Sequence, residues 1–273
     1  MHWKKLLPRY LILILFSLVV VLPLSGMLLS AFKSETEVNA SPFALPEQIT
    51  LENFSQAWSV GHFNIFFKNS VIVTTVVVTV SVFLSVLAGY AIGQLPLPGR
   101  KWIYPLLLLG YMVPFEAVII PLYNLMDVLG LRDTYWALIL PQVGLSVSFG
   151  TLWMTAFFEN APSELVDAAA MDGCSRWQTL WQVLWPLAQP AVTTLTVLFF
   201  MWTWNEFLLA LVMVQNESMR TLPVGLSFFL GRYSANIPLL AAASIIVALP
   251  TVLIYIIFQR FFIRGMLGGA VKG

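Results

Sequence analysis

Long apolar stretches alternate along the chain with short polar ones. Each apolar stretch holds about 20 or more residues, the length that a helix needs to cross the hydrocarbon core of a bilayer. None alternates apolar and polar residues as the strands of a membrane β-barrel do. Backbone groups in lipid must therefore be satisfied within each stretch, which requires helices. We predict six transmembrane helices, over residues 10–32, 70–93, 102–123, 135–158, 191–214 and 239–263.

Composition places the whole chain in the membrane. Hydrophobic residues make up 59% of its 273 residues and charged residues only 10%, against about 25% in soluble domains. A net charge of +1 gives no electrostatic support for binding nucleic acid. Cys174 is the single cysteine, which excludes an internal disulfide or a multi-cysteine metal site, and His2 and His62 lie far apart. We expect no metal site.

The N-terminus has the basic start of a secretory signal, with Lys4, Lys5 and Arg9 before an apolar run. That run, residues 10–32, exceeds the roughly 7–15 residues of a signal h-region and suits a spanning helix. We therefore expect a retained first helix.

Lysine and arginine predict the orientation, because they are in excess in cytoplasmic loops. With six spans the two termini share a side. That side would hold nine of these residues and the other side five, so we place both termini in the cytoplasm. The nine are Lys4, Lys5, Arg9, Arg100, Lys101, Arg176, Arg260, Arg264 and Lys272; the five are Lys33, Lys68, Arg132, Arg220 and Arg232.

The polar connections are too short to fold as soluble domains. We expect one membrane domain in three parts: a first helix and outer loop over 1–69, a helical core over 70–263, and a cytoplasmic tail over 264–273. Within the core, residues 159–190 form a cytoplasmic loop. Gly89 and Gly93 in the second span have the GxxxG spacing that lets helices cross closely, although this spacing is frequent by chance.

The loop over 159–190 is predicted to hold two helices. Pro162 and Ser163 open the first, Glu164 suits the positive end of its dipole, and Gly173 can end it as a C-terminal cap. Ser175 and Gln178 have the capping-box spacing that starts the second. This helix carries an apolar stripe, and two prolines should break the chain before the fifth span. The stripe is Trp177, Leu180, Trp181, Leu184 and Trp185; the prolines are Pro186 and Pro190.

The spacing alone leaves two roles open for this loop, an anchor on lipid and a dock for a partner. The small residues Ala168, Ala169 and Ala170 beside the acid Asp167 favour a dock, since they let another surface approach the backbone and lipid would not require them.

These residues resemble the EAA loop of binding-protein-dependent ABC importer permeases. That pattern is E-A-A, three residues, G, nine residues and I-x-L-P. Asp167-Ala168-Ala169, Gly173 and Val183-Leu184-Trp185-Pro186 match its spacing, with Asp for Glu, Val for Ile and Trp for Leu. Other stretches are similar to the carbohydrate branch, whose familiar type is the smaller membrane subunit of maltose-type transporters. They are NSVIVTT at 69, AGYAIGQLPLPGR at 88, MVPFEAVIIPLYNLMDVLGLRDT at 112, WNEF at 204, RTLPVGL at 220 and GGAVKG at 268.

The resemblance implies an all-α, six-helix type-1 ABC permease in the inner membrane of a prokaryote, surrounded by lipid. Its partners would be a second permease subunit, an ATPase dimer and an extracytoplasmic substrate-binding protein. The loop would dock on the ATPase through Asp167, Ala168, Ala169 and Gly173. The chain has no G-x-x-x-x-G-K-[ST] phosphate loop, so ATP and Mg would bind the partner ATPase, and this chain would hold no cofactor and be no enzyme.

Two acids, Glu116 and Glu206, fall inside predicted spans at similar depths. A carboxylate in lipid costs several kcal/mol, so each should face a cavity or a partner. Pro114 and Pro121 should interrupt the third span near Glu116, as in many transport pathways. A sugar pathway would use Trp202, Trp204 and Asn205 beside Glu206, the tryptophans by stacking. The alternative is that both acids bond to neighbouring helices or to the second permease.

Other functions stay open at this level. One is an ABC importer permease for a solute other than a sugar. A second is a stand-alone transporter that couples to ions through Glu116 or Glu206. A membrane-embedded enzyme has less support, because no His–carboxylate cluster accompanies a nucleophile.

Overall fold

The computed structural model describes the backbone of residues 3–231 and 236–270 and the side chains of residues 8–231 and 236–261. Several cations used for the orientation lie outside the described side chains: Lys4, Lys5, Arg232, Arg264 and Lys272. So do the side chains of the GGAVKG stretch. The chain forms two compact units, Met1–Phe66 with Val224–Pro250, and Phe67–Pro223 with Thr251–Gly273.

All regular elements among the described residues are helices, and none is a β-strand. Five helices are long and apolar enough to cross a membrane, and a bent pair makes a sixth span if its halves are counted together. This agrees with the six predicted spans. The five are α1 (Trp3–Ala31), α4 (Phe63–Gln94), α7 (Tyr135–Glu159), the continuous run Arg176–Trp204 that ends in α10 (Trp185–Trp204), and α12 (Ile237–Ala270).

The third span is the bent pair, α5 (Arg100–Met112) and α6 (Phe115–Val128), whose axes differ by 91°. The break falls at Val113 and Pro114, which are both extended. A residue before proline avoids the helical region and proline lacks an N–H, so the helix ends there. Pro114 thus interrupts the span as predicted. Pro121, by contrast, lies inside α6 without ending it.

The fifth span begins earlier than predicted, and the expected break at the two prolines is wrong. Helix α9 (Arg176–Gln178) continues into a π-helical segment, η1 (Thr179–Leu184), and then directly into α10. Within it the Trp185 N–H bonds to the Leu180 carbonyl, five residues back. Pro186 and Pro190 both lie within this continuous run without ending it.

The first unit holds α1, the loop helices α2 (Glu35–Ala40) and α3 (Glu52–Val60), and most of a 3₁₀ helix, η3 (Leu222–Phe229). Lys33 is buried at the end of α1, and its ammonium donates to the Ser41 carbonyl at 2.9 Å. The Asn53 amide donates to the carbonyls of Ala31 and Lys33. The predicted outer loop is therefore folded against the end of α1.

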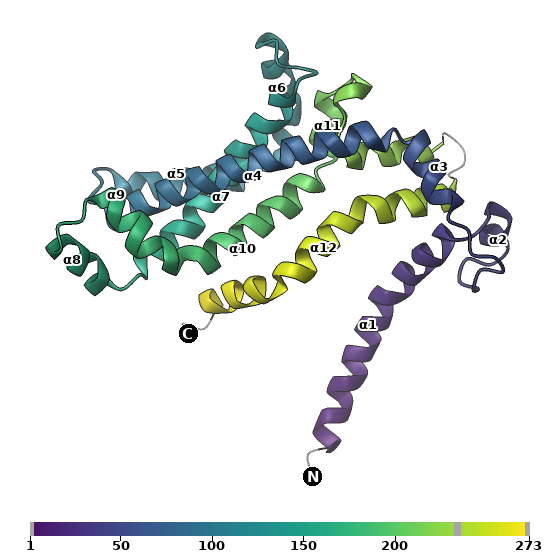
Figure 1. Ribbon diagram of the computed structural model, residues 1–273, viewed down its shortest axis with the longest axis horizontal. Coiled ribbons are helices and arrows are strands. Elements are labelled where there is room, and N and C mark those ends of the chain that lie inside the picture. Colours follow the sequence, from purple (N-terminus) through teal and green to yellow (C-terminus); the bar gives the residue numbers. More distant parts are fainter. Residues whose placement is uncertain (1–2, 232–235, 271–273) are drawn as a thin grey trace. The chain divides into compact units, whose positions relative to one another are not determined.

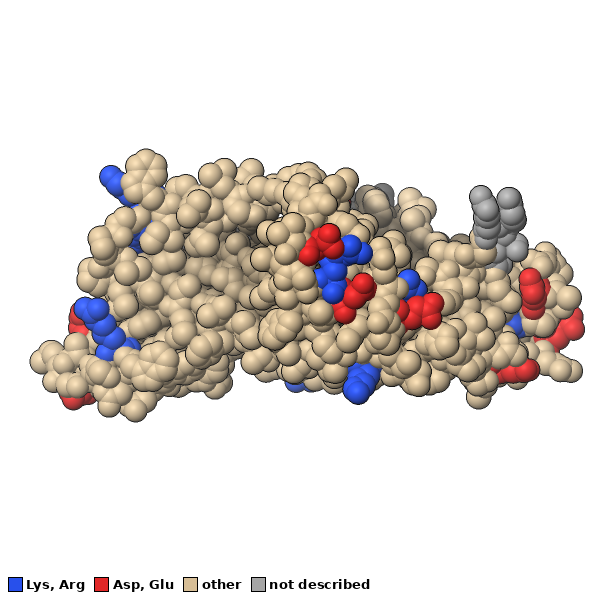
Figure 2. Space-filling model, turned by 90° about the horizontal axis from the view of Figure 1, so that it is seen from above, with Lys and Arg blue, Asp and Glu red and all other residues tan. Residues whose placement is uncertain are grey.

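The second unit is a helical bundle in which α5 and α10 both pack on α7, and α4 crosses α7 closely (Figure 1). A Cβ on Gly89 would lie 2.5 Å from the Met154 Cβ, and one on Gly93 would lie 2.9 Å from the Phe158 Cβ. The GxxxG spacing therefore marks a real helix contact. Figure 2 shows a surface that is mostly uncharged, with acids and bases in a few groups, as expected of a protein in lipid.

The Gly89 contact gives a stability prediction. Gly89→Ala should destabilise the fold by about 1–3 kcal/mol, because its methyl group meets the Met154 backbone at 2.9 Å and the helices must separate. Gly144→Ala in α7 is the matched control, since nothing lies within 4 Å of a Cβ there. Its effect should be neutral or stabilising. Thermal unfolding in detergent compares them, and equal melting temperatures would contradict the close crossing.

Candidate coupling segment and membrane site

The predicted loop over 159–190 begins with helix α8 (Ser163–Met171), which ends in a glycine cap. Gly173 has a φ of 80°, the left-handed conformation that glycine adopts without strain. Its N–H donates to the Ala170 carbonyl at 3.1 Å, and the Cys174 N–H donates to the Ala169 carbonyl at 2.9 Å. These two bonds form a Schellman motif. The predicted end of the first helix is confirmed.

The second predicted helix begins at its predicted cap. The Gln178 N–H donates to the Ser175 hydroxyl, and the Ser175 N–H donates to the Gln178 side chain at 2.8 Å. Leu180 and Leu184 of the apolar stripe are buried in the core of the second unit. The three tryptophans of the stripe form a row of ring contacts, with centroids 5.6 and 4.9 Å apart. All of the stripe but Trp177, which is 59% exposed, therefore packs the segment onto the bundle.

Helix α8 has an inward and an outward face. Ala169 is buried and Val166 packs against the core of the bundle. Asp167 and Ala168 are exposed, and so is Gly173 in the turn. Of the four predicted docking residues, Ala169 thus packs within its own chain. Nothing in the sequence pattern distinguished it from Ala168.

The exposed face of α8 combines acids with one large apolar side chain. Met171 is 90% exposed, and Asp167 and Glu164 stand on the same helix. Asp167 has no ion-pair or hydrogen-bond partner within the described part of the chain. An unpaired acid beside an exposed methionine can bind a basic and apolar surface. Asp167 and Met171 are four residues apart on α8 and share a face, and sequence reasoning did not assign Met171 a role.

Both predicted membrane acids stand where a span breaks. Glu116 is exposed in the first turn of α6, directly after the break at Pro114. Glu206 lies between α10 and the short helix α11 (Leu208–Met213), and its carboxylate accepts from the Leu209 N–H at 2.8 Å. The N-terminal ends of half-helices stabilise negative charge. This arrangement explains how both acids are tolerated inside apolar spans.

The two predicted tryptophans point to different environments. Trp204 is 3% exposed and stacks on Phe200, with centroids 5.5 Å apart. Trp202 is 44% exposed, and its ring meets the edge of Phe149 at 5.1 Å. Residues two apart on a helix face nearly opposite ways. Only Trp202 can therefore offer a ring to a solute on its face.

Trp202 belongs to an aromatic row that sequence reasoning missed. Phe149 of α7 connects it to Tyr111, and the centroids of these two rings are 5.3 Å apart. Tyr111 lies in the last turn of α5, directly before the break. Asn205 lies nearby along the chain, is exposed, and donates to the Met201 carbonyl and the Thr251 hydroxyl. The row joins residues of three helices that are far apart in the sequence, so only the structure shows that they are neighbours.

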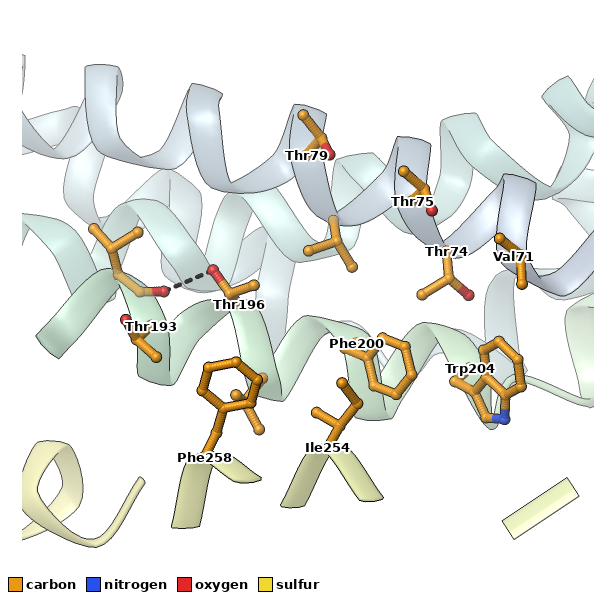
Figure 3. Close-up of a pocket in the computed structure, with 13 residues that line it drawn as sticks. Val71, Thr74, Thr75, Thr79, Thr193, Thr196, Phe200, Trp204, Ile254 and Phe258 are labelled. Carbon is orange, nitrogen blue, oxygen red and sulfur yellow. Dashed lines mark hydrogen bonds between the residues drawn. The ribbon is translucent and has the colours of Figure 1, made fainter. Parts of the chain in front are cut away.

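A cavity of about 400 Å³ lies between α4, α10 and α12 in the second unit. Figure 3 shows threonines on α4 and α10 around it, with Trp204 at one end and Ile254 and Phe258 from α12. The Thr74 hydroxyl is buried without a partner in the described structure. The remaining lining is mainly valine and aromatic, with no charged side chain. Such a wall is poorly suited to a sugar, which needs several convergent polar groups.

Sequence reasoning missed the threonines of this cavity. The available signal was the pair of Thr-Thr steps within apolar spans, Thr74-Thr75 and Thr193-Thr194. Within the described residues no group of three histidine, cysteine or acidic side chains could hold a metal ion.

Comparison with known proteins decides the family. Residues 81–267 match the family described as "Binding-protein-dependent transport system inner membrane component". The chain belongs to this family. It is therefore a multi-pass membrane permease of an ABC importer, one component of a larger transport system. Membership favours this class over the stand-alone transporter and the membrane-embedded enzyme.

Curated relatives extend the similarity over nearly the whole permease. It is 33% identical over 261 residues to the probable ABC transporter permease protein YurM of Bacillus subtilis, covering 96% of this chain and 87% of the relative. It is 35% identical over 252 residues to the sulfoquinovosyl glycerol transport system permease protein SmoH of Agrobacterium fabrum, covering 92% and 88%. The arabinooligosaccharides transport system permease protein AraQ of Halalkalibacterium halodurans is 34% identical over 259 residues, covering 93% and 92%.

A solved structure shows the same fold. It is a chain of a bacterial ABC transporter involved in the import of the acidic polysaccharide alginate. The TM-score is 0.82 at 23% identity, and the match covers 96% of this permease and 97% of that chain. The permease thus has the fold of an ABC importer permease.

Proposed function

We propose that this permease carries a sugar or a short oligosaccharide. The observation that supports this most strongly is the set of relatives named for such solutes, which include permeases for arabinooligosaccharides, diacetylchitobiose and trehalose. The exposed ring of Trp202 agrees with it, because an aromatic face can stack on the C–H surface of a sugar. A solute of another class remains the alternative that the experiment below tests.

The partners follow from the family's way of working. The permease pairs with a second permease subunit, receives solute from a substrate-binding protein outside, and is driven by an ATPase dimer that binds ATP and Mg inside. Both termini and the loop over 159–190 then lie in the cytoplasm of a prokaryote. Asp167 and Ala168, exposed on α8, contact the ATPase, and Gly173 holds the turn that presents them.

The solute passes the face where spans three and five break. Glu116, Asn205 and Glu206 stand at these breaks, and Trp202 with Tyr111 supplies exposed rings. Broken helices with their ends turned to the solute are a recurrent device of transporters. Trp204 is left out of this pathway, because its ring is buried against Phe200 and Phe67.

Reconstitution tests the proposal. The permease, with the second permease, ATPase and binding protein encoded beside it, is placed in proteoliposomes with labelled trehalose, arabinotriose or diacetylchitobiose. We expect uptake of one of them with ATP inside and none with a proton or sodium gradient alone. Uptake driven by a gradient without ATPase would overturn ATP coupling. ATP-dependent uptake of an amino acid and none of the sugars would overturn the solute class.

A further inference from the structure

Both ends of the turn that carries α8 are bonded to one face of α4. We call residues 159–175 the α8 hairpin. The side-chain amide of Gln94 donates to the Phe158 carbonyl, just before the hairpin. The Tyr90 hydroxyl donates to the Arg176 carbonyl at 2.9 Å, just after it. Tyr90 and Gln94 are four residues apart and share a helix face. The second span therefore closes the base of the α8 hairpin.

Tyr90 is held in place by packing as well as by its hydrogen bond. The residue is 6% exposed, and its ring meets the edge of Phe158 with centroids 5.7 Å apart. Gly93, three residues after Tyr90 on α4, lies in the close contact between α4 and α7. Phenylalanine at position 90 would keep the ring and its packing, but it would lose the bond to Arg176, which only the hydroxyl can make.

The bond from Tyr90 is made just before the chain passes from α-helical to π-helical geometry. Arg176 begins α9, which passes within three residues into the π-helical segment η1. Leu180 and Leu184 of η1 share one buried cluster with Tyr90, Met154 and Phe158. Packed cores transmit displacement because they are close-packed. A push on α8 can therefore reach three spans, α4, α7 and α10, through one block.

We infer that Tyr90 is a positioning residue for energy coupling. Its hydroxyl fixes the exit of the α8 hairpin to α4, so that movement of α8 displaces α4 together with α7 and α10. Without the bond, only the packing of the residue 90 ring joins the exit of the hairpin to α4, so less of the movement of α8 reaches α4. This inference rests on the proposed function, in which an ATPase moves α8.

Tyr90→Phe tests it in the reconstituted complex. ATP hydrolysis and uptake are measured in the same vesicles, with whichever of trehalose, arabinotriose and diacetylchitobiose the unmodified complex takes up. We expect uptake per ATP to fall at least threefold while the amount of bound ATPase is unchanged. Tyr104→Phe is the matched control, because it removes the hydroxyl of a half-exposed tyrosine on α5. Its ratio should equal that of the unmodified complex.

Hydrogen exchange gives a readout on the permease alone. Amides of residues 163–175 should exchange faster in Tyr90→Phe than in Tyr104→Phe, because one end of the hairpin is released. Gln94→Ala removes the bond to Phe158 at the other end, where the Arg100–Glu159 ion pair remains, and should act in the same direction on both measurements.

Each outcome bears on a different claim. An unchanged uptake-per-ATP ratio in Tyr90→Phe, with ATPase bound, overturns the inference and leaves the proposed function intact. A lower melting temperature or yield with an unchanged ratio shows a purely structural role and also overturns it. Failure of the unmodified permease to bind any ATPase overturns the proposed function, and this inference with it.

Discussion

Replacing Asp167 by arginine is expected to remove most binding of the ATPase while the membrane helices still fold. The carboxylate is exposed on α8 and has no partner within the described part of its own chain. If it pairs with a basic group of the ATPase, the arginine places like charges together. A change of this kind costs about 3 kcal/mol, or roughly a hundredfold in affinity. Co-purification of the ATPase with the tagged permease measures it.

The matched control is Asp172→Arg, at the residue that directly follows α8. This change has the same charge difference, and Asp172 is exposed at the C-terminal end of α8, where a basic residue is favoured by the helix dipole. Membrane insertion and melting temperature should be normal in both variants. Equal recovery of ATPase with Asp167→Arg and the unmodified permease would refute the docking role of Asp167.

A backbone change should disturb the same surface without altering its charge. Gly173→Pro cannot adopt the φ of 80° and removes the N–H that bonds to Ala170, so the end of α8 must rearrange. Gly130→Pro imposes a similar strain in another loop, at a φ of 68°. We expect ATPase recovery to fall for Gly173→Pro and to persist for Gly130→Pro. Similar losses from both would point to general misfolding instead of docking.

Trp204→Ala is expected to have the largest effect on stability, a loss of about 3 kcal/mol or more. The ring is 3% exposed and packs against Phe67 and Phe200, with centroids 5.6 and 5.5 Å away. Truncation would enlarge the cavity of about 400 Å³ that Trp204 already borders. Chemical or thermal unfolding in detergent measures the loss.

Trp202→Ala is the comparison variant, and it should affect uptake of the solute more than stability. This ring is 44% exposed, so its removal should cost far less stability. If the exposed ring stacks on the solute, uptake should require several times more solute for the same rate. A stability loss equal to that of Trp204→Ala, or unaltered uptake, would show that Trp202 does not contact the solute.

Most of the helical framework was predictable, because it depends on local chemistry. A run of about 20 apolar residues marks a span in any fold. The caps at Gly173 and Ser175 use bonds within five residues, so they could be read from spacing. The error at Pro186 has a local cause too. A π-helical segment shifts the hydrogen-bond register before it, and neither its sequence, TLWQVL, nor any propensity signals this.

The candidate site was only partly predictable, because exposure depends on neighbours distant in sequence. The pattern gave Trp202 and Trp204 the same role. In the structure Trp202 joins Phe149 and Tyr111 in an exposed aromatic row. Trp204 is instead buried against Phe67 and Phe200. Glu116 and Glu206 could be located within spans from hydropathy. Their places at the starts of half-helices required the observed breaks.

The sequence by itself determined that this chain is a helical membrane protein, where its long apolar helices lie, and where α8 begins and ends. These properties follow from the length of apolar runs and from hydrogen bonds between near neighbours. Only the tertiary structure decided that Ala169 faces inward, that Gly89 admits α7, and that Tyr90 reaches Arg176. Such contacts join residues far apart along the chain, and they form only where the packing of whole helices brings them together.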